Sequence, residues 1–63
     1  MLFSEVKDVI LEIKIKKVCL VQLGFVPTAD SEVTLNENNQ LDGVVTIKGI
    51  SYLFSENKFM RAI

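Results

Sequence analysis

The chain has 63 residues, 49% of them hydrophobic, and a formal net charge of −1. A chain of this length forms one domain, residues 1–63, without a deep cleft between two lobes. It contains no histidine and a single cysteine, Cys19, which excludes an intrachain disulfide and a histidine-containing zinc site. We expect Cys19 to be a small buried residue in a reducing compartment and the protein to be cytoplasmic.

The hydrophobic content is high for a domain of this size. A chain of about 60 residues buries only about 60% of the surface that its unfolded form exposes. Apolar side chains that the interior cannot hold then lie at the surface, where they form an interaction patch or are buried against a second copy of the chain. We expect the second arrangement, a homo-oligomer and most simply a homodimer.

Residues 9–16 are predicted to form a strand, because apolar and charged side chains alternate along them, as in a strand with one face in water. The apolar positions are Leu11, Ile13 and Ile15, and the charged positions are Glu12, Lys14 and Lys16. The alternative is a helix from about Ser4 to Leu11, capped by Ser4, because apolar residues also recur there at spacings of three and four. The state of residues 4–12 stays open between helix and strand.

Residues 17–26 are predicted to continue as a strand that is buried on both faces, because apolar side chains occupy both parities. A bulge at Lys16-Lys17 would join the two segments into one long bent strand, which is how small sheets curl into barrels. The apolar run at 18–26 is too short for a membrane span, which needs about 20 apolar residues. We therefore expect no membrane partner.

The second half of the chain is predicted to form hairpins. Residues 33–36 alternate apolar and polar side chains, the polar residues 37–40 turn the chain, and residues 41–47 return as a strand. Gly49 then breaks the pattern before a further strand at 50–54.

The last nine residues are predicted to form a short helix. Ser55 is a candidate N-cap, and Phe54 and Phe59 stand at the two positions of a hydrophobic staple. Two helical turns are marginal alone, so Phe59 must pack on the sheet or on a neighbour. The predicted fold class is mostly β, with α+β as the alternative: a small antiparallel sheet or partly open barrel of four to five strands with a short C-terminal helix.

Catalytic chemistry has little support in the sequence. Without a histidine, neither Cys19 nor any serine has an imidazole to activate it. Glu37 and Asp42 could face each other across the predicted loop as a general acid and base, but exposed carboxylates in a loop are more often solvated charges. The oxygen-rich stretch at 30–42 lacks the spacing of a calcium loop. We expect no enzymatic activity, no cofactor and no metal.

The predicted function is that of a non-enzymatic protein-interaction module that acts through a sheet face or edge as a homo-oligomer. The abundance of Lys, Asn, Ile and Phe is typical of AT-rich coding, which suggests a regulator or inhibitor from a low-GC bacterium, its phage or a plasmid. The protein partner is not identified. The candidate contact residues are Lys14, Lys16, Lys17, Tyr52, Phe59 and Met60.

The alternative function is that of a small barrel that binds single-stranded nucleic acid. Its candidate residues are Lys14, Lys16, Lys48 and Tyr52. Lysines can follow the phosphates of a single strand while an aromatic ring stacks on a base. A net charge of −1 argues against this partner, because binding that depends on counterion release normally accompanies a basic excess.

Overall fold

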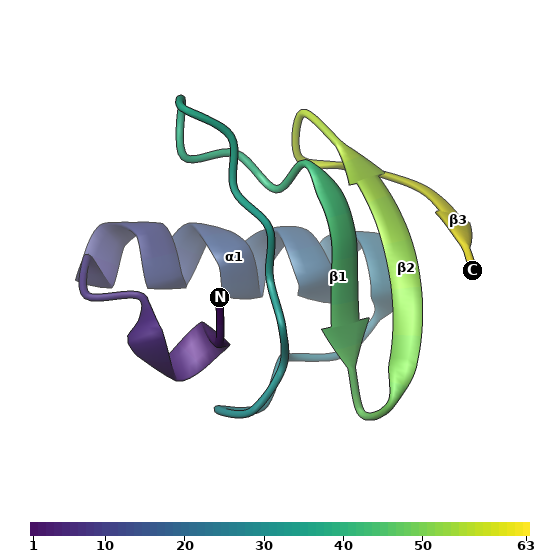
Figure 1. The fold of residues 1–63 in the computed structure, drawn as a ribbon, viewed down its shortest axis with the longest axis horizontal. Helices are drawn as coiled ribbons and strands as arrows, with labels where there is room; N and C mark the ends of the chain where they lie inside the picture. The colour runs from purple at the N-terminus through teal and green to yellow at the C-terminus, as the bar shows by residue number, and fades with distance from the viewer.

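One α-helix packs on one face of a three-stranded antiparallel sheet (Figure 1) in the computed structural model, which describes all residues, 1–63. The elements in chain order are the 3-10 helix η1 (Phe3–Glu5), the helix α1 (Val9–Leu23) and the strands β1 (Gly43–Ile47), β2 (Ile50–Ser55) and β3 (Lys58–Ala62). The sheet is open, with the order β1-β2-β3. The fold is therefore a small α+β arrangement. The prediction of a mostly-β sheet or barrel with four to five strands is wrong.

The helix α1 begins and ends at residues suited to these positions. The Oδ1 atom of Asp8 accepts hydrogen bonds from the backbone N–H groups of Ile10 at 2.9 Å and Leu11 at 3.3 Å, which satisfies two donors of the first turn. Gly24 has φ +79°, which glycine adopts without strain, and its N–H donates to the carbonyl of Leu20 at 2.9 Å. No glycine or proline interrupts the fifteen residues between these two caps.

The strands predicted at 9–16 and 17–26 are therefore wrong, since the chain is helical from 9 to 23. The alternative helix from Ser4 to Leu11 has a different extent, because Ser4 lies in η1 and α1 begins at Val9. A continuous apolar run is compatible with both a buried strand and a buried helix, and the capping residues decide here for the helix.

The C-terminal segment is a strand, and the predicted helix at 55–63 is wrong. Glu56 and Asn57 have φ +49° and +68°, and they form a two-residue turn that returns the chain as β3. Phe54 and Phe59 are paired across β2 and β3, with ring centroids 5.9 Å apart in an edge-to-face arrangement. Their spacing, which suggested a helical staple, serves a cross-strand contact.

The hairpin of β1 and β2 confirms the strand predicted at 50–54 and, from Gly43 onward, the strand predicted at 41–47. Lys48 and Gly49 form the two-residue turn between them, both with positive φ. The strand predicted at 33–36 is wrong, because only one isolated bridge joins Leu35 to Leu41. Glu32 instead pairs with Thr46 of β1 through two backbone hydrogen bonds of 3.0 and 2.8 Å, which places this segment beside β1.

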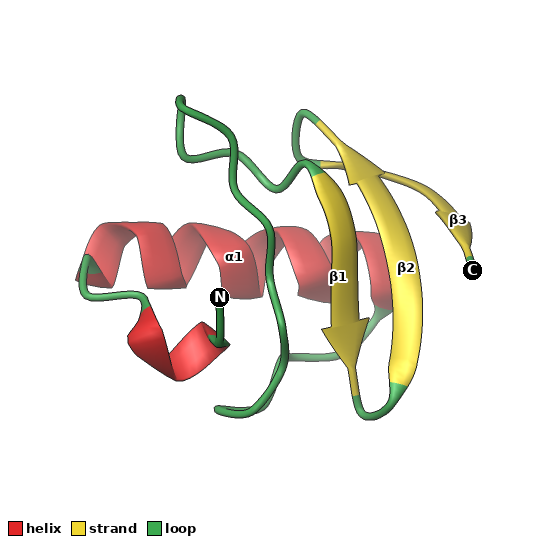
Figure 2. Cartoon of the chain, viewed as in Figure 1, coloured by secondary structure: helices red, strands yellow, loops and turns green.

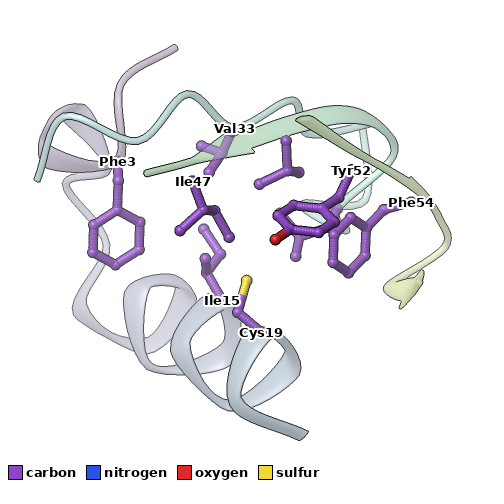
Figure 3. Close-up of a cluster of buried hydrophobic side chains, with 9 residues drawn as sticks. Phe3, Ile15, Cys19, Val33, Ile47, Tyr52 and Phe54 are labelled. Carbon is purple, nitrogen blue, oxygen red and sulfur yellow. The ribbon is translucent and has the colours of Figure 1, made fainter. Parts of the chain in front are cut away.

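The core lies between α1 and the sheet (Figure 3). Ile15 and Cys19 point from α1 toward the side chains of the sheet layer, and Phe3 closes the core beside them. The other buried members are Val33, Leu41, Val45, Ile47, Tyr52 and Phe54. The expectation that Cys19 is buried is confirmed. No helix of the protein combines the length and the apolar character that a transmembrane span requires.

Candidate interaction surface

The helix α1 is apolar on two opposite sides, and the sheet covers only one of them. Figure 2 shows the helix behind the hairpin of β1 and β2, so that its far side carries no other element. We call the side toward the sheet the inner face; it consists of Leu11, Ile15, Val18, Cys19 and Leu23, all buried or half-buried. A helix that is apolar all round is normally covered all round.

The opposite side, which we call the outer face, is apolar and exposed. Its apolar members are Val9, Ile10, Ile13, Leu20 and Val21, with exposed fractions of 66, 66, 59, 53 and 72%. Its charged members are Lys14 and Lys17. Five large apolar side chains that are each more than half exposed on a single helix form a patch of the kind that marks an interaction site.

Lys17 lies in the middle of the outer face. Ile13, Leu20 and Val21 stand four residues before it, three after it and four after it, which are the spacings of neighbours on a helix surface. Neither Lys17 nor Lys14 makes an ion pair within the molecule. The outer face therefore presents a cation without a partner among aliphatic side chains.

Lys16 occupies the rim of the outer face and is already engaged. Its Nζ atom lies 3.7 Å from a carboxylate oxygen of Glu12 and 6.0 Å from the centroid of the Phe3 ring. The ion pair is exposed, so it contributes at most about 1 kcal/mol to stability. Since Glu12 is the only acidic residue of α1, no carboxylate of the helix remains for Lys14 or Lys17.

The remaining predicted contact residues lie elsewhere. Tyr52 is buried, with its ring 5.9 Å from the rings of Phe25 and Phe59. Phe59 is half-buried on the same side of the sheet, and Met60 is exposed on β3. Of the six candidates, the structure thus brings together the three lysines of α1 and places Tyr52 and Phe59 in or against the core.

The residues proposed for nucleic-acid binding do not share one surface. Lys14 and Lys16 belong to α1, whereas Lys48 lies in the β1–β2 turn with its Nζ atom 5.7 Å from the centroid of the Phe25 ring. The aromatic member, Tyr52, is inside the protein. A base has no access to its ring in this structure.

The two edges of the sheet are unequally available. The β1 edge is occupied by Glu32, which is itself bridged to Leu2. The β3 edge is open, but an irregularity interrupts its register between Leu53 and Phe54, and the strand carries Lys58 and Arg61. Bulges and charged side chains on an edge strand discourage pairing with another strand. The outer face of α1 is thus the less protected surface.

The thiol of Cys19 is shielded from solvent by the same packing that leaves the outer face open. Burial raises the pKa of the Cys19 thiol to about 11, so the group is protonated at neutral pH. No side chains gather into a group of three or more potential metal ligands, and the surface has no pocket.

No family model, curated protein or solved structure matches the chain. Arguments about function therefore depend on the surface of this chain alone.

The predicted contact residues included the lysines but missed the apolar members of the outer face. The strand interpretation assigned Ile10 and Ile13 to a sheet, and no other feature set them apart. A signal was present, since Ile10, Ile13, Lys17 and Leu20 follow one another at spacings of three, four and three. This is the repeat of a helix seam.

Proposed function

We propose that the protein is a non-enzymatic protein-interaction module that binds another polypeptide through the outer face of α1. The observation that carries the proposal is the exposure of five large apolar side chains on a helix whose opposite side is the core. Covering them would remove apolar area from water, at about 25 cal/mol for each Å². The role of a regulator or inhibitor, which works by contact alone, agrees with this proposal.

The homo-oligomer expected from the sequence stays a prediction. The proposed contact lies on α1 and not on a sheet edge, because Glu32 occupies the β1 edge and the β3 edge has an irregular register and carries two cations. The nucleic-acid alternative gains no support, because its aromatic residue is buried and its lysines are dispersed.

Photocrosslinking from two positions tests the proposal. A benzophenone amino acid replaces Ile13 of the outer face in one protein and Val44, an exposed residue of β1, in the other. After irradiation in cells of the native host, we expect a discrete covalent adduct from position 13 and none from position 44. Mass spectrometry identifies the attached polypeptide, and an adduct of twice the chain mass would identify the homodimer.

The proposal is wrong if position 13 gives no adduct, or if position 44 gives the same adducts in the same yield. In either case the apolar surface of α1 is not where the protein meets its partner.

A further inference from the structure

We propose that the partner of the outer face is an amphipathic helix of a different protein, with carboxylates in the middle of its apolar stripe. This inference rests on the proposed function, and it adds the chemistry of the partner. The outer face has a shape that suits a helix, and its lysines have no carboxylate in α1 to neutralise them.

The shape of the outer face suits a helix. The residues Ile10, Ile13, Lys17 and Leu20 form a straight seam with the spacing that helices use to pack side by side. The helix α1 has 15 residues and is therefore about 22 Å long, or about four turns, of which the seam from Ile10 to Leu20 occupies about three. A second helix laid along this seam covers all five apolar side chains at once.

The lysines define the charge of that second helix. Lys17 lies within the seam, so a helix that covers the apolar residues also removes the Lys17 ammonium group from much of its water. An ammonium group that loses water without gaining a partner is costly, whereas an opposed carboxylate offsets the loss. Lys14 stands one turn before Lys17 and is also unpaired. Carboxylates opposite these two positions complete the contact.

Two α1 helices from two copies of this chain in full overlap do not supply these carboxylates to each other. The lysines at 14, 16 and 17 all lie within two residues of position 16, which is the midpoint of α1. Two antiparallel copies in full overlap would bring three lysines from each copy together at the two-fold axis, and two parallel copies would place each lysine beside its own counterpart. The single acidic residue of α1, Glu12, is already paired with Lys16. Like charges placed opposite each other oppose association.

An anionic membrane fits the outer face less well than a helix does. Helices that lie in a membrane interface carry their lysines on the polar side, away from the acyl chains. Here Lys17 is surrounded by Ile13, Leu20 and Val21, so the apolar residues cannot enter the acyl region without taking the ammonium group with them. A protein helix can place a carboxylate at this one point.

Two designed peptides test the inference. Both are amphipathic helices of four turns with leucine along one stripe; one carries glutamates at the middle of that stripe and the other carries lysines there. Binding to the full chain is measured by fluorescence anisotropy at two salt concentrations. We expect the glutamate peptide to bind at least about tenfold tighter at low salt, with a smaller difference at high salt.

Variants of the protein locate the binding. Ile13→Glu should abolish binding of the glutamate peptide, whereas Ile50→Glu, at an equally exposed isoleucine of β2, should not. Lys17→Glu should remove or reverse the preference for the glutamate peptide, whereas Lys58→Glu, on β3, should leave it unchanged. Circular dichroism establishes that each variant is folded before its affinity is compared.

The outcomes separate the inference from the proposed function. Equal binding of the two peptides, lost for both in Ile13→Glu, would overturn the acidic partner and leave the outer face as the contact surface. Binding of neither peptide, together with no adduct from position 13, would overturn both. A wild-type dimer at micromolar concentration that Ile13→Glu dissociates, or binding to phosphatidylglycerol vesicles that the same variant abolishes, would replace the acidic helix by a second copy or by a lipid surface.

Discussion

The inner face of α1 carries Ile15, which is 2% exposed, whereas the outer face carries Ile13, which is 59% exposed. The two isoleucines are two residues apart on one helix, and the two faces are similar in apolar content. They differ because the hairpin of β1 and β2 packs against one side only (Figure 1). Apolar composition therefore identifies neither the core side nor the contact side of this helix, and the position of the sheet assigns both.

The largest expected effect is the difference in the free energy of unfolding between truncating a side chain of the inner face and truncating one of the outer face. Ile15→Ala should lower the free energy of unfolding by about 2–5 kcal/mol, because it removes buried methylene and methyl groups and leaves a cavity. Ile13→Ala should change it by less than about 0.5 kcal/mol, because water already surrounds the side chain. Urea unfolding followed by circular dichroism measures both.

Ile15→Val, with an expected loss of about 0.5–1.5 kcal/mol, keeps this comparison measurable if Ile15→Ala does not fold. Similar losses in Ile15→Ala and Ile13→Ala would show that the outer face is also covered within one chain.

The Cys19 thiol on the inner face makes the free energy of unfolding depend on pH. Its pKa is raised from an ordinary value of 9.0 to about 11 by burial, so the unfolded chain loses the thiol proton at lower pH than the native protein does. The native state then holds more protons between these two values, and the free energy of unfolding falls as the pH rises through this window. Well below pH 9 the thiol should add no pH dependence to the free energy of unfolding, because it is protonated in both states.

Urea unfolding between pH 8 and 11 measures this effect, with Cys19→Ala as the control that removes the thiol and leaves the lysines in place. The assignment to Cys19 is wrong if the wild type and Cys19→Ala lose stability in parallel across the window.

Removing the N-cap should lower the stability of the whole helix α1, without distinguishing its inner from its outer face. Asp8→Ala leaves the N–H groups of Ile10 and Leu11 without their carboxylate acceptor and should cost about 1 kcal/mol. Asp8→Ser retains an acceptor at this position and should recover most of that loss. Thermal unfolding followed by circular dichroism compares the three proteins, and no loss in Asp8→Ala would show that the cap does not determine where α1 begins.

The smallest effect on folding is expected from Lys17→Leu, which makes the outer face continuous in apolar character. The free energy of unfolding should stay within about 0.5 kcal/mol of the wild-type value, because the side chain is exposed. Self-association should rise, because the central charge no longer opposes pairing of two copies. Sedimentation equilibrium of wild type and Lys17→Leu measures this. Equal association of both proteins would show that the charge of Lys17 does not oppose the pairing of two copies.

The C-terminal third of the fold contains both strands that sequence patterns predict and a turn that they do not. The return of the chain at 41–47, the alternation of residues 50–54 and the break at Gly49 predict β1 and β2, because each pattern refers to adjacent residues. The turn at Glu56 and Asn57 was missed, since glutamate is not a typical residue for positive φ. Its Asn57 is held instead by Leu41, whose N–H donates to Oδ1 at 2.7 Å across sixteen positions of sequence.

The sequence alone predicted the lysines of the candidate site, but it did not predict the exposed apolar residues around them. Lys14, Lys16 and Lys17 stand out in any reading of the chain, because three cations fall within four residues. The apolar residues around them belong to a run that fits a strand and a helix equally well.

By itself, the sequence determined the β1–β2 hairpin and the excess of apolar side chains over what the interior holds. Only the tertiary structure decided that the last strand turns back on β2 and that Ile13 rather than Ile15 meets solvent. The physical reason is that a helix with two apolar sides has no preferred orientation of its own. Its orientation is set by what packs against it, and here that is chiefly the β1–β2 hairpin, formed by residues twenty or more positions later in the chain.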